Sequence, residues 1–164
     1  MRRLAALPFA LLAAAPALGQ DYVALTPEQI GQIYCISIVA SDMAPVEGLL
    51  TAGLREAIVV AEEKNDAFEA AHPGDKPPLG DGLPWQAGAD YTPVCEVGPV
   101  TFMMDEARVE LQYGFPDYPD ANFRDWLYLQ LVTSDAGLRV WRIDNVRFAD
   151  SDMRTDLIGL FLDN

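Results

Sequence analysis

The sequence predicts an α+β fold in which a curved antiparallel sheet of about four strands packs against two N-terminal helices in a cone-like arrangement, with a short C-terminal helix. Three observations favour it. Two stretches of helical periodicity come first, residues 106–148 then alternate as half-buried strands do, and a Pro- and Gly-rich stretch separates the two parts. About 145 residues follow the N-terminal segment, which is the size of one domain with one core.

The first 19 residues have the pattern of a secretory signal peptide. Arg2 and Arg3 precede an Ala- and Leu-rich stretch, and small residues stand at Ala17 and Gly19. The stretch is short for a membrane anchor and no later run has about 18 uninterrupted apolar residues, so we expect no membrane insertion. We therefore expect residues 20–164 to form a single domain in the periplasm or outside the cell.

The composition is strongly acidic. The sequence has 11 basic and 25 acidic residues, a net charge of −14, and without Arg2 and Arg3 nine basic residues remain, for a net charge of about −16. Such a surface repels nucleic acid, so we expect no nucleic-acid partner. The acidity either keeps the protein soluble or attracts a basic partner.

The two cysteines, Cys35 and Cys95, predict one disulfide, because an even number of cysteines in an oxidising compartment pairs. The bond would tie the first helix to the first strand and close a loop of about 60 residues, which stabilises the fold by up to ~4 kcal/mol in the chain-entropy treatment. There is no C-x-x-C motif, and with one histidine the chain has too few ligands for a zinc site. We expect no metal and no cofactor.

The first helix has a clear start. Thr26 is suited to the N-cap, Pro27 to the first helical position and Gln29 to a capping box. Apolar residues then recur at helical spacing, and the helix should end between Ser41 and Pro45.

A second helix is predicted from about Pro45 to about Ala71, although Gly48 and Gly53 weaken its first half. His72, the only histidine, follows the helix. We interpret it as a capping residue favoured by the helix dipole, with acid–base chemistry as the alternative.

Residues 73–93 are rich in proline and glycine and predict a long loop without regular structure. Four large apolar residues are spaced along it: Leu79, Leu83, Trp85 and Tyr91. We expect these side chains to pin the loop onto the domain. A functional lid is the alternative.

The strands follow. The first should span Cys95 to Met104. In the second, one face is apolar and the other polar, and the apolar residues are Ala107, Val109, Leu111, Tyr113 and Phe115. The third has apolar residues on both faces, with Trp126 and Tyr128 opposite a leucine face, which is typical of an interior strand.

In the last strand the apolar spacing changes from two to three between Ile143 and Val146, which predicts a β-bulge near Asp144 and Asn145. A short helix should follow over residues 152–161, with Asp150 or Ser151 as its cap.

Several groups are candidates for binding or chemistry. Trp85, Tyr91, Tyr113, Trp126 and Tyr128 are the candidate residues for binding a ligand or partner, and burial in the core is the alternative for the aromatic group. Tyr113 beside a buried carboxylate would suit proton abstraction, but no spacing identifies that carboxylate.

Acidic and amide residues also cluster around the hairpin that follows the second strand: Asp117, Asp120, Asn122 and Asp125. Calcium binding and turn formation are the two interpretations, and we favour the turn, because Asp, Asn and Pro are ordinary turn residues.

With its two helices, long loop, antiparallel strands and final W-x-I-D-N-V run (Trp141 to Val146), the chain resembles the nuclear transport factor 2-like superfamily over roughly residues 26–161. The resemblance implies a bent sheet and helices that form a cone, whose cavity is an active site in some members, a ligand pocket in others and a dimer face in the rest. It implies no particular function.

The sequence therefore favours an exported, non-enzymatic module that binds a small molecule or a protein partner, for example an inhibitor or immunity protein, as a monomer or homodimer. The alternative is a small-molecule enzyme, an isomerase or hydrolase, that acts inside the cone.

Overall fold

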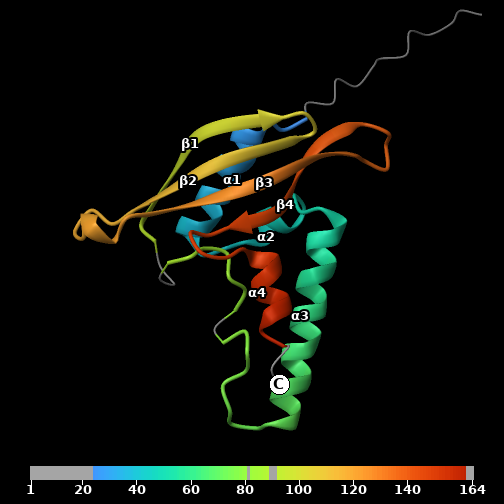
Figure 1. Cartoon of the computed structure of the whole chain (residues 1–164), viewed down its shortest axis with the longest axis vertical. Helices are drawn as coiled ribbons and strands as arrows, with labels where there is room; N and C mark the ends of the chain where they lie inside the picture. Colours follow the sequence, from blue (N-terminus) through green and yellow to red (C-terminus); the bar gives the residue numbers. More distant parts are fainter. Residues whose placement is uncertain (1–23, 81, 89–91, 162–164) are drawn as a thin grey trace, which may run out of the picture.

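The computed structural model describes residues 24–80, 82–88 and 92–161 and has an α+β fold (Figure 1). The predicted signal peptide, residues 1–19, lies outside the described residues. The elements in chain order are α1 (Pro27–Ala40), α2 (Ala44–Glu47), α3 (Ala52–Ala71), β1 (Val94–Met103), β2 (Glu106–Gly114), η1 (Pro119–Ala121), β3 (Phe123–Thr133), β4 (Arg139–Arg147) and α4 (Met153–Gly159). None of the helices in these ranges is long and apolar enough to cross a membrane.

The four strands form one antiparallel sheet, as predicted. The sheet is open, and its strand order is β1-β2-β3-β4. Its two faces differ along β2, where Ala107, Val109, Leu111 and Tyr113 are buried while the residues between them are exposed or half-buried. We call the face with these buried residues the inner face. The side chains on this face belong to the core, together with the inward-facing side chains of the neighbouring strands.

The predicted bulge in β4 is confirmed. Tyr128 of β3 lies opposite Asn145, whereas Leu129 lies opposite Ile143, so Asp144 is the additional residue. Because of this extra residue, Ile143 and Val146 are both buried on the inner face.

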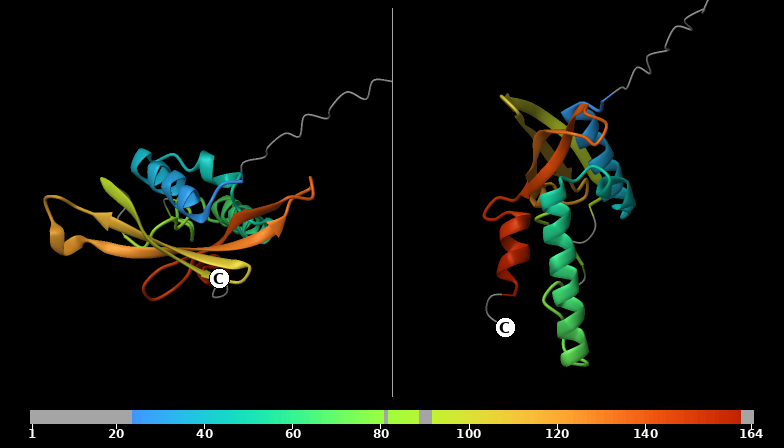
Figure 2. Two further views of the ribbon diagram at one scale, coloured as in Figure 1. Left: turned by 90° about the horizontal axis from the view of Figure 1, so that it is seen from above. Right: turned by 90° about the vertical axis from the view of Figure 1, so that its right-hand side faces the viewer.

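α1 lies across the inner face of the sheet (Figure 2). Its capping box forms as predicted, with Thr26 Oγ1 accepting from the Gln29 amide and Gln29 Oε1 accepting from the Thr26 amide. The helix comes close to the strands at Gly31, where a Cβ atom would lie 2.8 Å from Val109 Cγ1. A side chain there would have to push α1 away from the sheet.

The prediction of one helix from Pro45 to Ala71 is wrong, because the structure divides this segment into α2 and α3. Thr51 caps α3 by accepting from the Leu54 amide at 3.2 Å. Between the two helices the backbone bonds to the bulged end of β4 instead, since the Ile143 amide donates to the Leu49 carbonyl and the Thr51 amide donates to the Ile143 carbonyl, both at 2.8 Å. These contacts with β4 interrupt the helix.

α3 then runs beyond the sheet, beside α4 (Figures 1 and 2). It ends where the sequence predicts, at His72, whose Nδ1 lies 3.1 Å from the Phe68 carbonyl and whose ring stacks on Phe68. α1 therefore covers the inner face of the sheet. α3 instead contacts β4, at the end of the sheet, and α4.

The cap of α4 is Asp152, and not Asp150 or Ser151 as predicted. Its carboxylate accepts from the Thr155 amide at 3.0 Å and from Asn145 Nδ2 at 2.8 Å. The hydrogen bond to Asn145 selects Asp152, because it ties the start of α4 to the residue that follows the bulge.

Candidate functional site

The long loop after α3 returns toward the sheet and has no helix or strand in its described residues, 73–80, 82–88 and 92–93. Leu79, Leu83 and Trp85 pack against the core, so the prediction of a pinned loop is confirmed for these three residues. Tyr91, the fourth predicted contact, lies outside the described residues.

Hydrogen bonds fasten the loop at its two ends. Near its start, the Leu79 amide donates to Asn65 Oδ1 of α3 at 3.0 Å. Near its end, the buried Thr92 donates from Oγ1 to Gln86 Oε1 at 2.9 Å. The loop therefore has a defined shape although it lacks regular secondary structure.

The middle of the loop is fastened to the core. The buried Tyr34 hydroxyl of α1 donates to the Trp85 carbonyl, and the Ala87 amide donates to Asp125 Oδ2 of β3 at 3.0 Å. The next residue, Gly88, lies so close to Phe123 that a Cβ atom there would be 2.3 Å from the ring. This part of the loop covers the inner side of β3.

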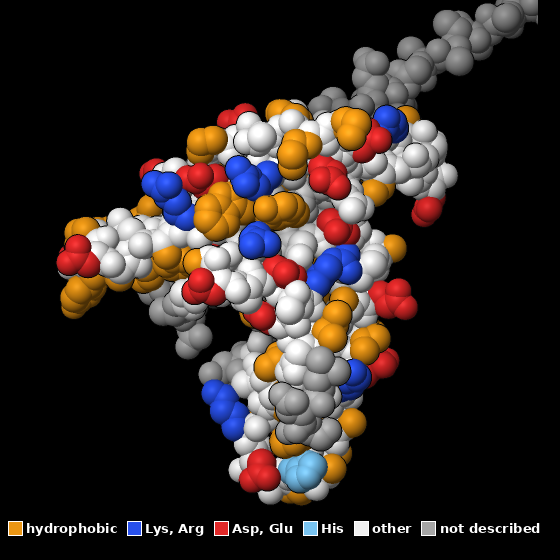
Figure 3. All heavy atoms as spheres, in the orientation of Figure 1, with side chains coloured by type: hydrophobic (Ala, Val, Ile, Leu, Met, Phe, Trp, Pro, Cys, Tyr) orange, Lys and Arg blue, Asp and Glu red, His pale blue; other side chains and the backbone are white. Residues whose placement is uncertain are grey.

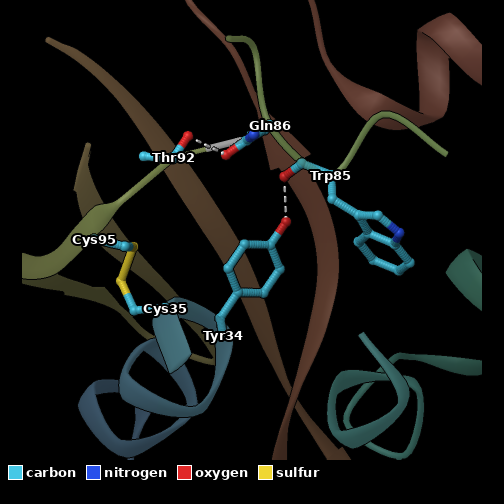
Figure 4. Close-up of a disulfide and its surroundings, with 6 residues drawn as sticks. All are labelled: Tyr34, Cys35, Trp85, Gln86, Thr92 and Cys95. Atoms are coloured by element: carbon cyan, nitrogen blue, oxygen red, sulfur yellow. Dashed lines mark hydrogen bonds between the residues drawn. A yellow bond between two sulfur atoms is a disulfide. The ribbon is translucent and has the colours of Figure 1, made fainter. Parts of the chain in front are cut away.

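The predicted disulfide between Cys35 and Cys95 is present, with the two Cα atoms 5.1 Å apart. Figure 4 shows that Tyr34 and Cys35, which are neighbours in α1, fasten the two ends of the segment from Trp85 to Cys95. One turn of α1 therefore positions both the loop and the start of β1.

A cavity of about 920 Å³ lies between the C-terminal end of α1 and the loop. Trp85 contributes to its wall. Most of its other lining residues are apolar, proline or glycine, but the surface that they present is about as polar as it is apolar. The described lining residues are Ile38, Ser41, Met43, Lys76, Pro77, Pro78, Leu79, Gly80, Gly82, Leu83, Pro84, Trp85, Gln86 and Gly88. Its size is that of a small-molecule site.

Three polar side chains are buried beneath the loop: Tyr34, Tyr113 and Asp125. Burial, opposed by the hydrogen bond from Ala87, raises the pKa of Asp125 to about 6. Burial and then the nearby Asp125 raise the pKa of Tyr113 above its ordinary value, and the pKa of Tyr34 rises for the same reasons and because of Tyr113. Both tyrosines therefore remain neutral hydroxyl groups at physiological pH.

The Tyr113 hydroxyl and Asp125 Oδ1 have no hydrogen-bond partner among the described residues. The sequence predicts that Tyr113 would need a buried carboxylate beside it but does not identify one. In the structure, Asp125 is that carboxylate. However, neither residue lines the cavity, so a ligand there meets the loop and not this pair.

The four predicted binding residues that the structure describes do not form one site. Trp85 lines the cavity and Tyr113 is buried beneath the loop, whereas Trp126 and Tyr128 lie half-buried on the opposite, outer face of β3. There Trp126 pairs with Arg147, and apolar side chains lie among charges of both signs on this side of the molecule (Figure 3).

Asp125 and Tyr34 are the site residues that sequence reasoning missed. The sequence groups Asp125 with the hairpin acids, but it belongs to β3 and is buried opposite Leu111. Its alternation with the inward Phe123 and Leu127 was the available signal. Among the hairpin residues, Asn122 forms the turn by accepting from the Phe115 amide at 2.8 Å.

No group of three or more His, Cys, Asp or Glu side chains within the described ranges is placed to hold a metal ion. No protein-family model matches the chain, and searches of curated proteins and of solved structures likewise return no match. The site must therefore be interpreted from its own geometry.

Proposed function

We propose that this protein is an exported, non-enzymatic binding module that holds a small apolar or aromatic molecule in the cavity between α1 and the loop. The observation that carries the proposal is a cavity of about 920 Å³ whose loop wall is fastened by hydrogen bonds to α1, α3 and β3. A wall held in place before binding lowers the entropic cost of binding.

We propose in addition that the domain has the cone-like architecture of the nuclear transport factor 2-like superfamily, with the loop at the mouth of the cone. Support comes from the bulge at Asp144, which bends the last strand, and from α1 lying across the inner face. Export is supported by the disulfide, because such bonds persist mainly in oxidising compartments.

An enzyme that works with Tyr113 and Asp125 is the second candidate function, since each carries a buried polar atom that no described residue hydrogen-bonds. A substrate would reach them only after Ala87 releases Asp125. We favour binding because the cavity is already formed, whereas the pair is covered.

The test uses the full chain exported to a bacterial periplasm and purified with its disulfide intact. Native mass spectrometry should show a retained small molecule. Trp85→Ala should lose it, because Trp85 lines the cavity. Trp126→Ala is the matched control and should retain it, because Trp126 lies on the other side of the sheet.

A second readout covers a ligand lost during purification. In a Trp126→Phe/Trp141→Phe protein, Trp85 is the remaining tryptophan of the three, so its fluorescence reports on the cavity. A library of apolar and aromatic fragments should include compounds that change this fluorescence. Bare protein together with no response to any fragment would refute the proposal, and turnover that Asp125→Asn abolishes would favour the enzyme.

A further inference from the structure

β1 stands at one end of the sheet, and no segment within the described ranges pairs with its outer edge, which we call the free edge (Figure 1). The strand at the other end, β4, is bridged by Leu50 and by Asp152, but no such bridge to β1 occurs among the described residues. The unpaired edge of a strand presents backbone donors and acceptors that a further extended segment can bond.

The hydrogen-bond pattern of the sheet identifies which backbone groups of β1 point away from β2. The Leu131 amide donates to the Asp105 carbonyl, so odd-numbered residues of β2 bond to β3 and even-numbered ones bond to β1. Glu96 lies opposite an even-numbered residue and therefore bonds inward. By alternation, the backbone N–H and C=O groups of Cys95 and Val97 point to the free edge.

A groove of about 710 Å³ lies between this edge and α1. Its α1 side carries Ile36 and Val39, which are 69% and 38% exposed, and the disulfide joins its two walls. Its other lining residues include two carboxylates, Glu28 on α1 and Glu96 on β1. The groove is thus apolar within and acidic at its sides.

We propose that this groove docks an extended segment of a partner protein in which apolar residues alternate with Lys or Arg. The segment adds a strand to β1 through the backbone of Cys95 and Val97. Successive side chains of a strand point to opposite faces, so one set covers Ile36 and Val39 on the α1 side while the other lies beside Glu96 on the outer face.

Charge favours a basic partner over a second copy of this chain. The chain has a net charge of −14, and pairing two copies through this edge would bring their Glu96 side chains close together. The register break between Val97 and Val100, with Pro99 inside it, limits the added strand to a few residues.

The test titrates the isotope-labelled, oxidised protein with a blocked hexapeptide of alternating lysine and valine, up to millimolar concentration. Amide shifts should concentrate at Cys95, Val97 and the exposed side of α1. Ile36→Asp should weaken binding at least about tenfold. Val59→Asp is the matched control and should leave binding unchanged, because Val59 is 45% exposed on α3, away from the groove.

Two further peptides separate the contribution of charge from that of backbone hydrogen bonding. Alternating glutamate and valine should bind at least about tenfold more weakly, and Glu96→Lys should reverse this preference. N-methylation of the lysine–valine peptide at the amides that face β1 should abolish binding, because it removes the donors.

Three results would overturn the proposal. One is the absence of shifts at β1 at millimolar lysine–valine peptide, and another is equal binding of the acidic peptide. The third is a dimer in sedimentation that Ile36→Asp dissociates, which would identify a second copy as the occupant.

Discussion

Asp125 occupies a position on β3 where its neighbours at the same spacing, Phe123 and Leu127, are apolar. Its carboxyl group is buried, and its known partner is the Ala87 amide. A carboxylate in such a place loses hydration, which is why its pKa rises to about 6. Asp125 therefore destabilises the folded state when ionised, yet it fastens the loop.

Because the pKa of Asp125 is raised in the folded state, the stability of the protein depends on pH. Between pH 3.8 and about 6 the folded protein holds a proton that the unfolded chain has released, so the contribution of Asp125 to stability falls as the pH rises through this window and is constant above it. Asp125→Asn removes the charge and keeps an acceptor for Ala87. The variant should match the wild type near pH 3 and be more stable by about 1 kcal/mol at pH 7, a figure reduced for solvent screening.

Urea unfolding of both proteins at several pH values measures this difference. Both proteins contain the same other carboxyl groups, so subtracting one free energy of unfolding from the other cancels their contributions. A stability difference that does not change with pH would show that Asp125 titrates normally.

At the scale of elements, the bulge in β4 and the break between α2 and α3 meet at one point. Asp144, the extra residue, accepts from Thr51 Oγ1 at 2.8 Å and from an Arg154 nitrogen at 2.7 Å. Arg154 also donates from Nε to the Asp144 carbonyl at 2.7 Å. The bulge thus joins the N-terminus of α3 to α4.

The Asp144–Arg154 pair should therefore be coupled more strongly than a surface ion pair. Its side chains are 26% and 29% exposed, whereas those of the Arg139–Asp105 pair are 56% and 69% exposed. Double-mutant cycles with alanine should give a coupling of about 1–2 kcal/mol for the first pair and under about 0.5 kcal/mol for the second, the control. Equal couplings would mean that the bulge is held by its backbone alone.

At the scale of the whole molecule, α1, the loop and the sheet depend on one another. α1 is bonded to β1 through sulfur and to the loop through the neighbouring Tyr34, while the loop in turn covers Asp125 of β3. Loosening either connection to α1 should affect the other, since Tyr34 and Cys35 lie in one turn of the helix.

Replacing Cys35 and Cys95 by serine should lower the free energy of unfolding by about 2–4 kcal/mol, because the bond joins residues 60 apart in the chain. Urea unfolding of the variant measures the loss, and wild-type protein with reductant should give a similar value. In the Trp126→Phe/Trp141→Phe background, the same replacement should also shift the Trp85 fluorescence toward that of an exposed indole. Unchanged stability would mean that packing of α1 alone holds the sheet.

Much of the fold could be predicted from local patterns. The capping box at Thr26, the alternation in β2 and the spacing change after Ile143 each reflect a period or a cap that a few neighbouring residues define, and each prediction is confirmed. The break at Thr51 could not be predicted in this way, because the residues that interrupt the helix lie about ninety positions later, in β4.

The sequence alone determined that two helical segments precede an antiparallel sheet, which side of β2 is buried, where β4 has its bulge, and that the two cysteines pair, because these depend on local periodicity and on the number of thiols. Only the tertiary structure decided that Asp125 lies under the loop, that Trp85 and Trp126 lie on opposite sides of the sheet, and that no described segment pairs with the outer edge of β1 beside α1. These features arise from contacts between distant residues, and such contacts depend on how the curved sheet, the helices and the loop pack together.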